Sequence, residues 1–343
     1  MKALLLEEYN KLTVADVPVP EYAPHEVLLR VRSVGICGSD VHGYDGTTGR
    51  RIPPIIMGHE AAGEIAEVGS EVRGWKKGDR VTFDSTIYPL DDWYSRRGQY
   101  NLSDGRRVLG VSCDEYRRDG AFAEYVAVPA YVLYRLPDEV SFDHAAMTEP
   151  LAVAMHAVAI TPLQQGDVAL VIGAGVIGLF IAKVLECSGC SEIVISDVQE
   201  SRREVARRLG FTHVVDPRQE NLNEVCAALT DGRGADVAFD AVGLGETIGQ
   251  SIDATRKGST VTLVGNLEAS TSFALQRVVA RQVRLQGSCA ICGEYPAALA
   301  MLKNERIDLS HIISRVGTLE EAPELFSRLH SADPELMKVI IHP

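Results

Sequence analysis

The chain has 343 residues, more than the roughly 250–300 at which a single hydrophobic core stops growing, so two domains are expected. Its 46% hydrophobic and 24% charged residues are typical of an ordinary globular protein. The net charge of −13 and the absence of lysine and arginine clusters argue against a nucleic-acid partner. No apolar stretch reaches the ~20 residues that cross a bilayer, which argues against a membrane partner.

Two further features suggest the compartment. The first ten residues lack the basic, apolar and small-residue order of a signal peptide. Seven cysteines are scattered between Cys37 and Cys292 without the spacing of a disulfide framework. We therefore expect a reducing environment and a cytoplasmic protein.

The first ~150 residues are rich in short β-type runs that glycine, proline and aspartate interrupt. Alternating or β-branched runs at residues 27–34, 62–68 and 80–83 are each bounded by turn residues. Many short strands with frequent turns indicate an irregular barrel. Residues 85–118 show the least periodicity and are predicted to form a long surface lobe.

After Glu149-Pro150 the pattern changes to alternating strands and helices. Buried strands are predicted at residues 167–173, 193–197, 213–216, 237–242 and 260–265, and helices at 176–186 and 201–209. This alternation is typical of a doubly wound parallel sheet, so the fold class is α/β. Two more helices are expected near residues 296–303 and 319–329.

A dinucleotide fingerprint lies where the first of these strands meets its helix. Gly173-Ala174-Gly175-Val176-Ile177-Gly178 matches G-x-G-x-x-G after an apolar strand and before an apolar-periodic helix. The glycines permit a tight turn, a close approach to a pyrophosphate and close helix packing, respectively. The phosphates would lie on unpaired N–H groups at the helix N-terminus. A purely structural glycine turn is the alternative.

The acidic residue at the end of the second strand favours NAD over NADP. Asp197 lies 19 residues beyond Gly178, where a carboxylate accepts hydrogen bonds from the adenosine ribose and repels a 2′-phosphate. Arg202 weakens this preference because an arginine could bind that phosphate. Val242 and Val264, at the ends of two later strands, complete the candidate cofactor contacts.

Candidate metal ligands are spread over the first 150 residues. Cys37 lies in Gly35-Ile36-Cys37-Gly38-Ser39-Asp40-Val41-His42, and His59 and Glu60 lie in Gly58-His59-Glu60. Glu149 stands where the two regions join. Catalytic zinc takes about three ligands of these types and leaves one position open. Each residue alone could equally be structural, as a small buried thiol or a core histidine.

Together these motifs resemble the zinc-containing medium-chain dehydrogenase/reductase superfamily, closest to its sorbitol (polyol) and threonine dehydrogenase branches. The resemblance rests on four motifs that follow the family's order, namely G-I-C-G-S-D-x-H, G-H-E, E-P-L and G-A-G-x-I-G. The resemblance implies a GroES-like irregular β-barrel catalytic domain of residues 1–152 and 289–343. It also implies an inserted Rossmann NAD-binding domain of residues 153–288, with the active site in the cleft.

The resemblance also assigns roles. Cys37 and His59 match zinc ligands, Glu60 the carboxylate that can ligate or step aside, and Glu149 the one that binds zinc or its water. Whether Glu60 or Glu149 is the third ligand stays open. Ser39 and His42 match positions of a proton relay. Asp40 is expected to orient the ligands, since ligating groups need fixed outer partners.

Two departures from the family pattern concern the lobe and the substrate. Residues 84–113 contain only Cys113, so we predict no structural zinc, as in the animal sorbitol dehydrogenases. Polyol dehydrogenases tend to carry an aromatic residue and an arginine soon after the glycine that matches Gly287, but here the chain reads Ser288-Cys289-Ala290-Ile291. Substitutes for these substrate contacts are sought at Tyr44, Trp93, Arg96, Tyr116 and Arg117.

The sequence thus predicts a zinc-dependent oxidoreductase that transfers hydride between a secondary alcohol of a sugar or polyol and NAD. The alternatives are a threonine- or butanediol-type dehydrogenase, a zinc-free NADPH-dependent quinone or enoyl reductase, and a nucleotide-binding protein without catalysis. One catalytic zinc ion, NAD and a small-molecule substrate are the expected ligands. The resemblance implies a homo-oligomer, a dimer or tetramer joined at the Rossmann sheet edge.

Overall fold

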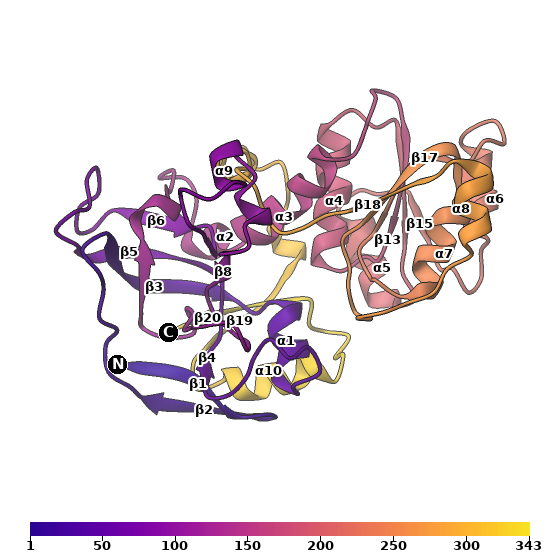
Figure 1. The fold of residues 1–343 in the computed structure, drawn as a ribbon. Coiled ribbons are helices and arrows are strands. Elements are labelled where there is room, and N and C mark those ends of the chain that lie inside the picture. Colours follow the sequence, from indigo (N-terminus) through magenta and orange to yellow (C-terminus); the bar gives the residue numbers. More distant parts are fainter. The chain divides into compact units, whose positions relative to one another are not determined.

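A computed structural model describes residues 1–343, which form two compact units (Figure 1). The first unit comprises Met1–Glu149 and Ile291–Pro343, and the second comprises Pro150–Ala290. These limits lie within three residues of the domain limits expected from the sequence. No helix combines the length and apolar character that a membrane crossing needs.

The first unit is built around one mixed sheet. Its order is β12 (Leu133–Arg135), β6 (Arg80–Phe83), β5 (Glu60–Val68), β3 (Glu26–Gly35), β20 (Lys338–His342) and β19 (Ile313–Thr318), with β11 (Tyr125–Pro129) also paired to β3. All pairs are antiparallel except β19 with β20. A second sheet has the order β2 (Lys11–Asp16), β1 (Lys2–Glu8) and β4 (Ile55–Ile56).

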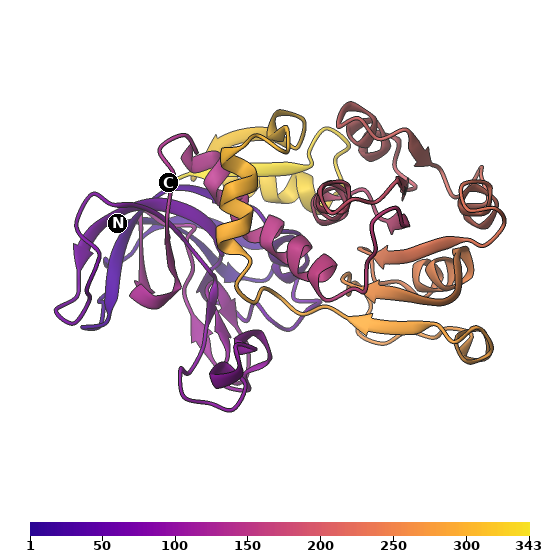
Figure 2. The same cartoon turned by 90° about the horizontal axis from the view of Figure 1, so that it is seen from above.

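The long strand β3 organises this unit because β5, β11 and β20 all pair with it. Strand β20 comes from the C-terminal end of the chain, and both termini lie in this unit (Figure 2). Apolar side chains of β1, β3 and β5 form the core together with Phe122 and Phe326. The C-terminal segment is therefore an integral part of the first unit.

Short elements complete the first unit. They are α1 (Gly38–Tyr44), α2 (Phe142–Ala146), α9 (Tyr295–Lys303), α10 (Ala322–His330), two-stranded ribbons of β7 (Thr86–Ile87) with β8 (Arg107–Val108) and β9 (Val111–Ser112) with β10 (Arg117–Arg118), and 3-10 turns at Ser95–Arg97, Tyr100–Leu102, Ala130–Val132 and Leu309–His311. The predicted surface lobe, residues 85–118, holds the two ribbons and the first two of these turns.

The second unit is a six-stranded parallel sheet. Its order is β15 (His213–Val215), β14 (Glu192–Ser196), β13 (Val168–Ile172), β16 (Ala235–Asp240), β17 (Thr255–Leu263) and β18 (Arg284–Gly287). The strand order reverses between β13 and β16, which is the switch point where doubly wound sheets bind ligands. Its helices are α4 (Val176–Cys187), α5 (Glu200–Arg208), α6 (Leu222–Ala228), α7 (Gly245–Ala254) and α8 (Leu275–Arg281).

The predicted strands of this sheet are all present, but β17 begins five residues before the predicted start. The helices differ more from expectation. Helices α6, α7 and α8 were not predicted from the sequence. Helix α3 (Thr148–Ala159) runs through Glu149-Pro150, where the sequence suggested only a junction. Proline is tolerated there because it occupies the first turn, where its missing N–H has no partner to lose.

Candidate metal and cofactor sites

The first candidate ligand, Cys37, lies at the start of α1. Its thiol caps the helix by accepting the backbone N–H of Ser39 at 3.4 Å, and the Ser39 hydroxyl donates to the same sulfur at 3.2 Å. Ser39 and His42 are three residues apart on this helix and therefore lie on the same face. Both are exposed, so the two relay candidates are open to solvent beside the thiol.

The second and third candidates lie at the start of β5, immediately after a turn at Gly58. This glycine has φ +97° and packs so closely on Phe122 that a side chain would collide with it. The turn places His59 before the strand and Glu60 at its first position, both buried. Ligand atoms of Cys37, His59 and Glu60 all lie within 4.8 Å of one another.

Asp40 and Arg51 form a buried support beneath these ligands. The guanidinium of Arg51 donates to Asp40 Oδ1 through Nε at 3.0 Å and Nη2 at 2.8 Å. Asp40 Oδ2 lies 3.5 Å from His59 Nδ1, and neither of these two buried atoms has a hydrogen-bond partner. Arg51 Nη2 also donates to Ser39 Oγ at 3.3 Å. The position expected to orient the ligands thus faces the histidine.

Lys338 on β20 holds Glu60 from the other end of the chain. Its buried ammonium donates to Glu60 Oε2 at 2.5 Å and to the carbonyl of Ile36 at 3.0 Å. Gly35 leaves the space that the carboxylate occupies, because a Cβ at Gly35 would overlap Glu60 Oε2. The ammonium of Lys338 therefore fixes both the carboxylate of Glu60 and the backbone at Ile36, next to Cys37.

Glu149 is half-buried in the first turn of α3 and is not one of the three clustered ligands. The Ser85 hydroxyl donates to its Oε1 at 3.5 Å. Burial raises the pKa of Glu149, His59 lowers it, and the nearby charge of Glu60 raises it further, with a net shift upward. A negative charge on Glu149 is therefore unfavourable beside that of Glu60 unless a cation lies close to both carboxylates.

The donor set fits a zinc ion. Burial lowers the pKa of His59, but the charges of Asp40 and Cys37 outweigh burial and raise it well above its usual value. The surroundings therefore favour positive charge at this point. A thiolate, an imidazole and a carboxylate are also the ligand types of catalytic zinc.

The glycine fingerprint forms the turn between β13 and α4. Gly173 has φ +99°, a left-handed conformation that favours glycine. A Cβ at Gly178 would overlap the carbonyl oxygen of Gly173, so this glycine permits the close helix–strand contact. Around Gly175 the nearest atom to an added Cβ is Arg202 Nη1 at 3.8 Å. The start of the helix, with the first-turn residues Val176 and Ile177, is therefore open to a phosphate.

Asp197 follows β14 directly and is held by backbone groups. Its Oδ2 accepts the N–H of Ala174 at 2.8 Å, and its Oδ1 accepts the N–H of Gln199 at 2.7 Å. Arg202 Nη1 lies 3.8 Å from Oδ2. A carboxylate has about four lone-pair sites, so acceptor capacity remains for ribose hydroxyls.

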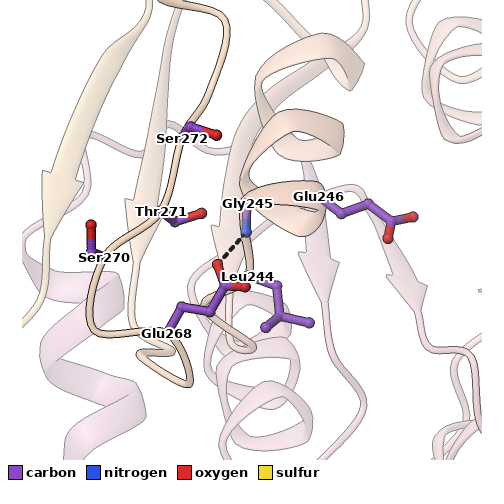
Figure 3. Close-up of a pocket in the computed structure, with 7 residues that line it drawn as sticks. All are labelled: Leu244, Gly245, Glu246, Glu268, Ser270, Thr271 and Ser272. Atoms are coloured by element: carbon purple, nitrogen blue, oxygen red, sulfur yellow. Dashed lines mark hydrogen bonds between the residues drawn. The ribbon is translucent and has the colours of Figure 1, made fainter.

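A polar pocket of about 640 Å³ lies in the loops that follow β16 and β17. Figure 3 shows its lining residues, with the Glu268 carboxylate accepting the N–H of Gly245 at 3.2 Å. The predicted contacts Val242 and Val264 lie in the same loops, both half-buried. The buried Asp240 accepts the N–H of Val242 at 3.0 Å and so positions the first loop. Because the Glu268 carboxylate accepts the N–H of Gly245, the N-terminus of α7 already has an anionic partner within the chain.

The proposed substrate contacts are dispersed. Tyr44 donates its hydroxyl to the carbonyl of Asn10, Tyr116 accepts the N–H of Val108, and Arg117 donates to the carbonyl of Ile52. Trp93 is exposed beneath the guanidinium of Arg97. Arg96 is exposed in a 3-10 turn. None of these five lies in the ligand cluster.

Sequence reasoning missed Lys338 and Arg51. A signal existed for Lys338, because a lysine that begins the apolar run KVII is unusual in a buried strand. No comparable signal marked Arg51, which stands next to another arginine in a polar loop.

Comparisons with known proteins identify the family of the chain. Residues 23–138 match the alcohol dehydrogenase GroES-like domain, and residues 176–304 match the zinc-binding dehydrogenase family. The chain is 34% identical to sorbitol dehydrogenase of Pongo abelii, covering 94% of this chain and 91% of that protein. It is 30% identical to sorbitol dehydrogenase of Bacillus subtilis strain 168, covering 100% and 97%.

The chain belongs to the zinc-containing medium-chain dehydrogenases, in the polyol dehydrogenase branch. It is an enzyme of the alcohol dehydrogenase type, acting on CH–OH donors. A crystal structure of a zinc-binding dehydrogenase homologue from Sinorhizobium meliloti 1021, bound to NADP, superposes with a TM-score of 0.90 at 31% identity, covering 100% and 99% of the two chains. The fold, with its GroES-like and Rossmann parts, is confirmed, as are zinc and a nicotinamide cofactor as the ligands of the family.

Proposed function

We propose that this enzyme oxidises a secondary hydroxyl of a polyol or sugar with NAD, using one zinc ion held by Cys37, His59 and Glu60. The observation that carries the proposal is the cluster of half-buried Cys37 with buried His59 and Glu60, in which the three ligand types meet within 4.8 Å. The similarity to sorbitol dehydrogenases supports a polyol-type substrate. The carboxylate of Asp197 beyond the glycine turn supports NAD as the preferred cofactor.

Glu60 is the better candidate for the third ligand. It belongs to the cluster of ligand atoms, whereas Glu149 does not. Lys338 holds one oxygen of Glu60, so the carboxylate is oriented before any ligand arrives. Glu149, with its raised pKa, is suited to hold a proton or a water molecule beside the site.

The chain's own residues then divide the work of alcohol oxidation. When bound, zinc polarises a substrate hydroxyl and NAD accepts the hydride. The Ser39 hydroxyl receives the substrate proton and passes it toward His42 on the same exposed helix face. Asp40 keeps the imidazole of His59 oriented. Burial raises the pKa of Asp40, but the charges of His59 and Arg51 outweigh burial and lower it to about 2, so the carboxyl is ionised.

The edge of the parallel sheet supports a homo-oligomer. Strand β18 ends the sheet order, so one side of it has no strand partner within the chain. Large apolar side chains nearby in sequence are exposed, including Leu275 at 65% and Val279 at 71%. We infer that a second copy covers this edge. Light scattering should show a dimer or tetramer that Val279→Asp dissociates, and a monomeric native protein would exclude it.

The seven cysteines are all free thiols, which supports a reducing compartment such as the cytoplasm.

The decisive test is a substrate screen of purified protein whose zinc content has been measured. Polyols, sugars, inositols, sugar acids, butanediol and amino alcohols are each offered with NAD or NADP while absorbance of the reduced cofactor is followed. We expect the highest kcat/KM for a polyol or sugar with NAD, and loss of activity when chelator removes zinc. Full activity of metal-free protein, or turnover of threonine or butanediol alone, would refute the proposal.

A further inference from the structure

The loop that carries Asp197 is clamped from the neighbouring strand by one carboxylate. Asp216, immediately after β15, is 6% exposed and accepts from Arg218 through Nε at 2.9 Å and Nη2 at 2.7 Å. Arg203, buried on α5, lies 3.1 Å from the same carboxylate through its Nη2. Each guanidinium also donates to the loop, Arg203 to the carbonyl of Asp197 at 2.7 Å and Arg218 to that of Val198 at 2.6 Å.

The two arginines differ in what else they bind. Arg203 also pairs with Glu200, so it keeps a carboxylate partner if Asp216 is lost. Asp216 is the only carboxylate that pairs with Arg218, whose side chain is 61% exposed. The hydrogen bonds from Arg218 lower the pKa of Asp216 and raise that of Arg218. Asp216 thus neutralises the guanidinium of Arg218. This guanidinium donates to the carbonyl of Val198, the residue that follows Asp197.

This position matters for the choice of cofactor. NADP differs from NAD by a 2′-phosphate on the adenosine ribose that Asp197 is proposed to bind, and arginines bind such phosphates in the related fold. Arg218 uses its Nε and Nη2 groups on the Asp216 carboxylate and the Val198 carbonyl, and the paired carboxylate offsets the positive charge that would otherwise attract a phosphate. The same contacts hold the Asp197–Val198 carbonyls, and so fix the direction of the Asp197 side chain.

We propose that Asp216 determines cofactor specificity without touching the cofactor. It occupies Arg218, which would otherwise attract the 2′-phosphate of NADP, and it braces the loop that presents Asp197. The inference rests on the proposed function only in that the cofactor's adenosine ribose lies at Asp197. Asp216 is a positioning residue, because it acts through Arg218 by pairing with the charge that would attract the 2′-phosphate.

The test compares binding of NADH and NADPH to the full-length zinc-loaded enzyme by fluorescence titration. In Asp216→Asn we expect weaker NADH binding and tighter NADPH binding, so that the ratio of the NADPH to the NADH dissociation constant falls about tenfold, the effect of roughly one charge-assisted hydrogen bond. Arg218→Met should weaken NADH binding without any gain for NADPH. This second variant removes the same contact at an exposed residue, where folding is less at risk.

The double variant Asp216→Asn/Arg218→Met identifies the source of the shift. If the freed guanidinium recruits the phosphate, the ratio returns to within about twofold of the native value. A ratio that stays shifted in the double variant would overturn the proposal, and so would equal weakening of both cofactors in Asp216→Asn.

Glu204→Gln is the matched control. Glu204 is an exposed carboxylate of α5 that pairs with Arg207 and Arg208, so the variant loses one negative charge on the same unit outside the clamp. It should leave the ratio unchanged. The native ratio itself tests whether the enzyme prefers NAD, whereas the change between variants tests Asp216, so the two hypotheses can fail separately.

Discussion

The candidate metal ligands of the first unit and the glycine turn of the second unit are held in place in different ways. Cys37 precedes α1, Glu60 begins β5 and Lys338 begins β20, and the buried Glu60 and Lys338 form an ion pair beside the half-buried thiol. The turn from Gly173 to Gly178 lies on one continuous segment, and its acidic partner Asp197 is held by backbone N–H groups. The first site depends on balanced charges, and the second on space and free backbone groups. Loss of one residue should therefore have different consequences in the two places.

The largest effect is expected for His59→Ala. Loss of an imidazole ligand should remove zinc and lower kcat by roughly a thousandfold or more, since metal polarisation contributes several kcal/mol to such reactions. NADH binding, measured by fluorescence, should stay within about twofold of the native value because its contacts lie in the second unit.

His311→Ala provides the control, because this histidine is partly exposed in the same unit, pairs with Asp308 at 3.6 Å and lies outside the ligand cluster. It should keep zinc and activity. Native turnover in His59→Ala would contradict the metal assignment, whereas loss of NADH binding would show that the two sites are not separable.

The second prediction concerns the buried ion pair. Lys338→Met should lower the unfolding free energy of the first unit by about 3–5 kcal/mol in metal-free protein, because Glu60 is left buried without a partner. Both tryptophans, Trp75 and Trp93, belong to this unit, so tryptophan fluorescence in denaturant reports its unfolding. Lys338→Met/Glu60→Gln should recover much of the loss. If the double variant is no more stable than Lys338→Met, the carboxylate is not the source of the cost.

The third prediction uses another buried charge of the first unit. Burial raises the pKa of Asp84 from 3.8 to about 6, although Thr86 and Tyr100 donate to it. The folded state therefore favours the protonated carboxyl, and the contribution of Asp84 to stability declines as pH rises from about 4 to about 6 and is level above that.

Asp84→Asn removes this dependence. Relative to the native protein, the variant should gain on the order of 3 kcal/mol between pH 4 and pH 7 in tryptophan-monitored unfolding. Asp91→Asn, an exposed change of the same kind in the same lobe, should show no such gain. A difference that is constant with pH would mean that Asp84 is ionised in the fold at pH 4.

The contrast between the two regions also explains what could be predicted from sequence. The parallel sheet and the glycine turn follow from local patterns, because each buried strand and each helix contacts its neighbours in the chain. The ligand types at Cys37, His59 and Glu60 were also identifiable. Their support was not, since Lys338 lies 278 residues from Glu60 and no short-range pattern links them.

The lobe and several helices were harder to predict for a related reason. Residues 85–118 are fixed by individual polar contacts such as that of Tyr100 with Asp84, and such contacts leave no periodic trace. Helix α7 begins with a glycine and holds a second one in its interior, and glycine is a poor helix former, while α6 and α8 have only seven residues each. Helix α3 contains a proline that suggested a boundary. In each case tertiary contacts determined the structure where local propensity was weak or misleading.

The smallest effect is expected at the glycine turn of the second unit, and it tests whether close packing positions the start of α4. Gly178→Ala places a methyl group against the carbonyl oxygen of Gly173, so α4 must move away from β13. Such overpacking costs about 1–3 kcal/mol, and the displaced helix should bind NADH roughly ten times more weakly. Zinc content should not change. Gly249→Ala is the control, because an added Cβ there meets no atom within 4 Å and alanine is the better helix former. If Gly178→Ala bound NADH as well as Gly249→Ala does, close packing would not position the helix start, and the contrast between charge balance and space would fail in the second unit.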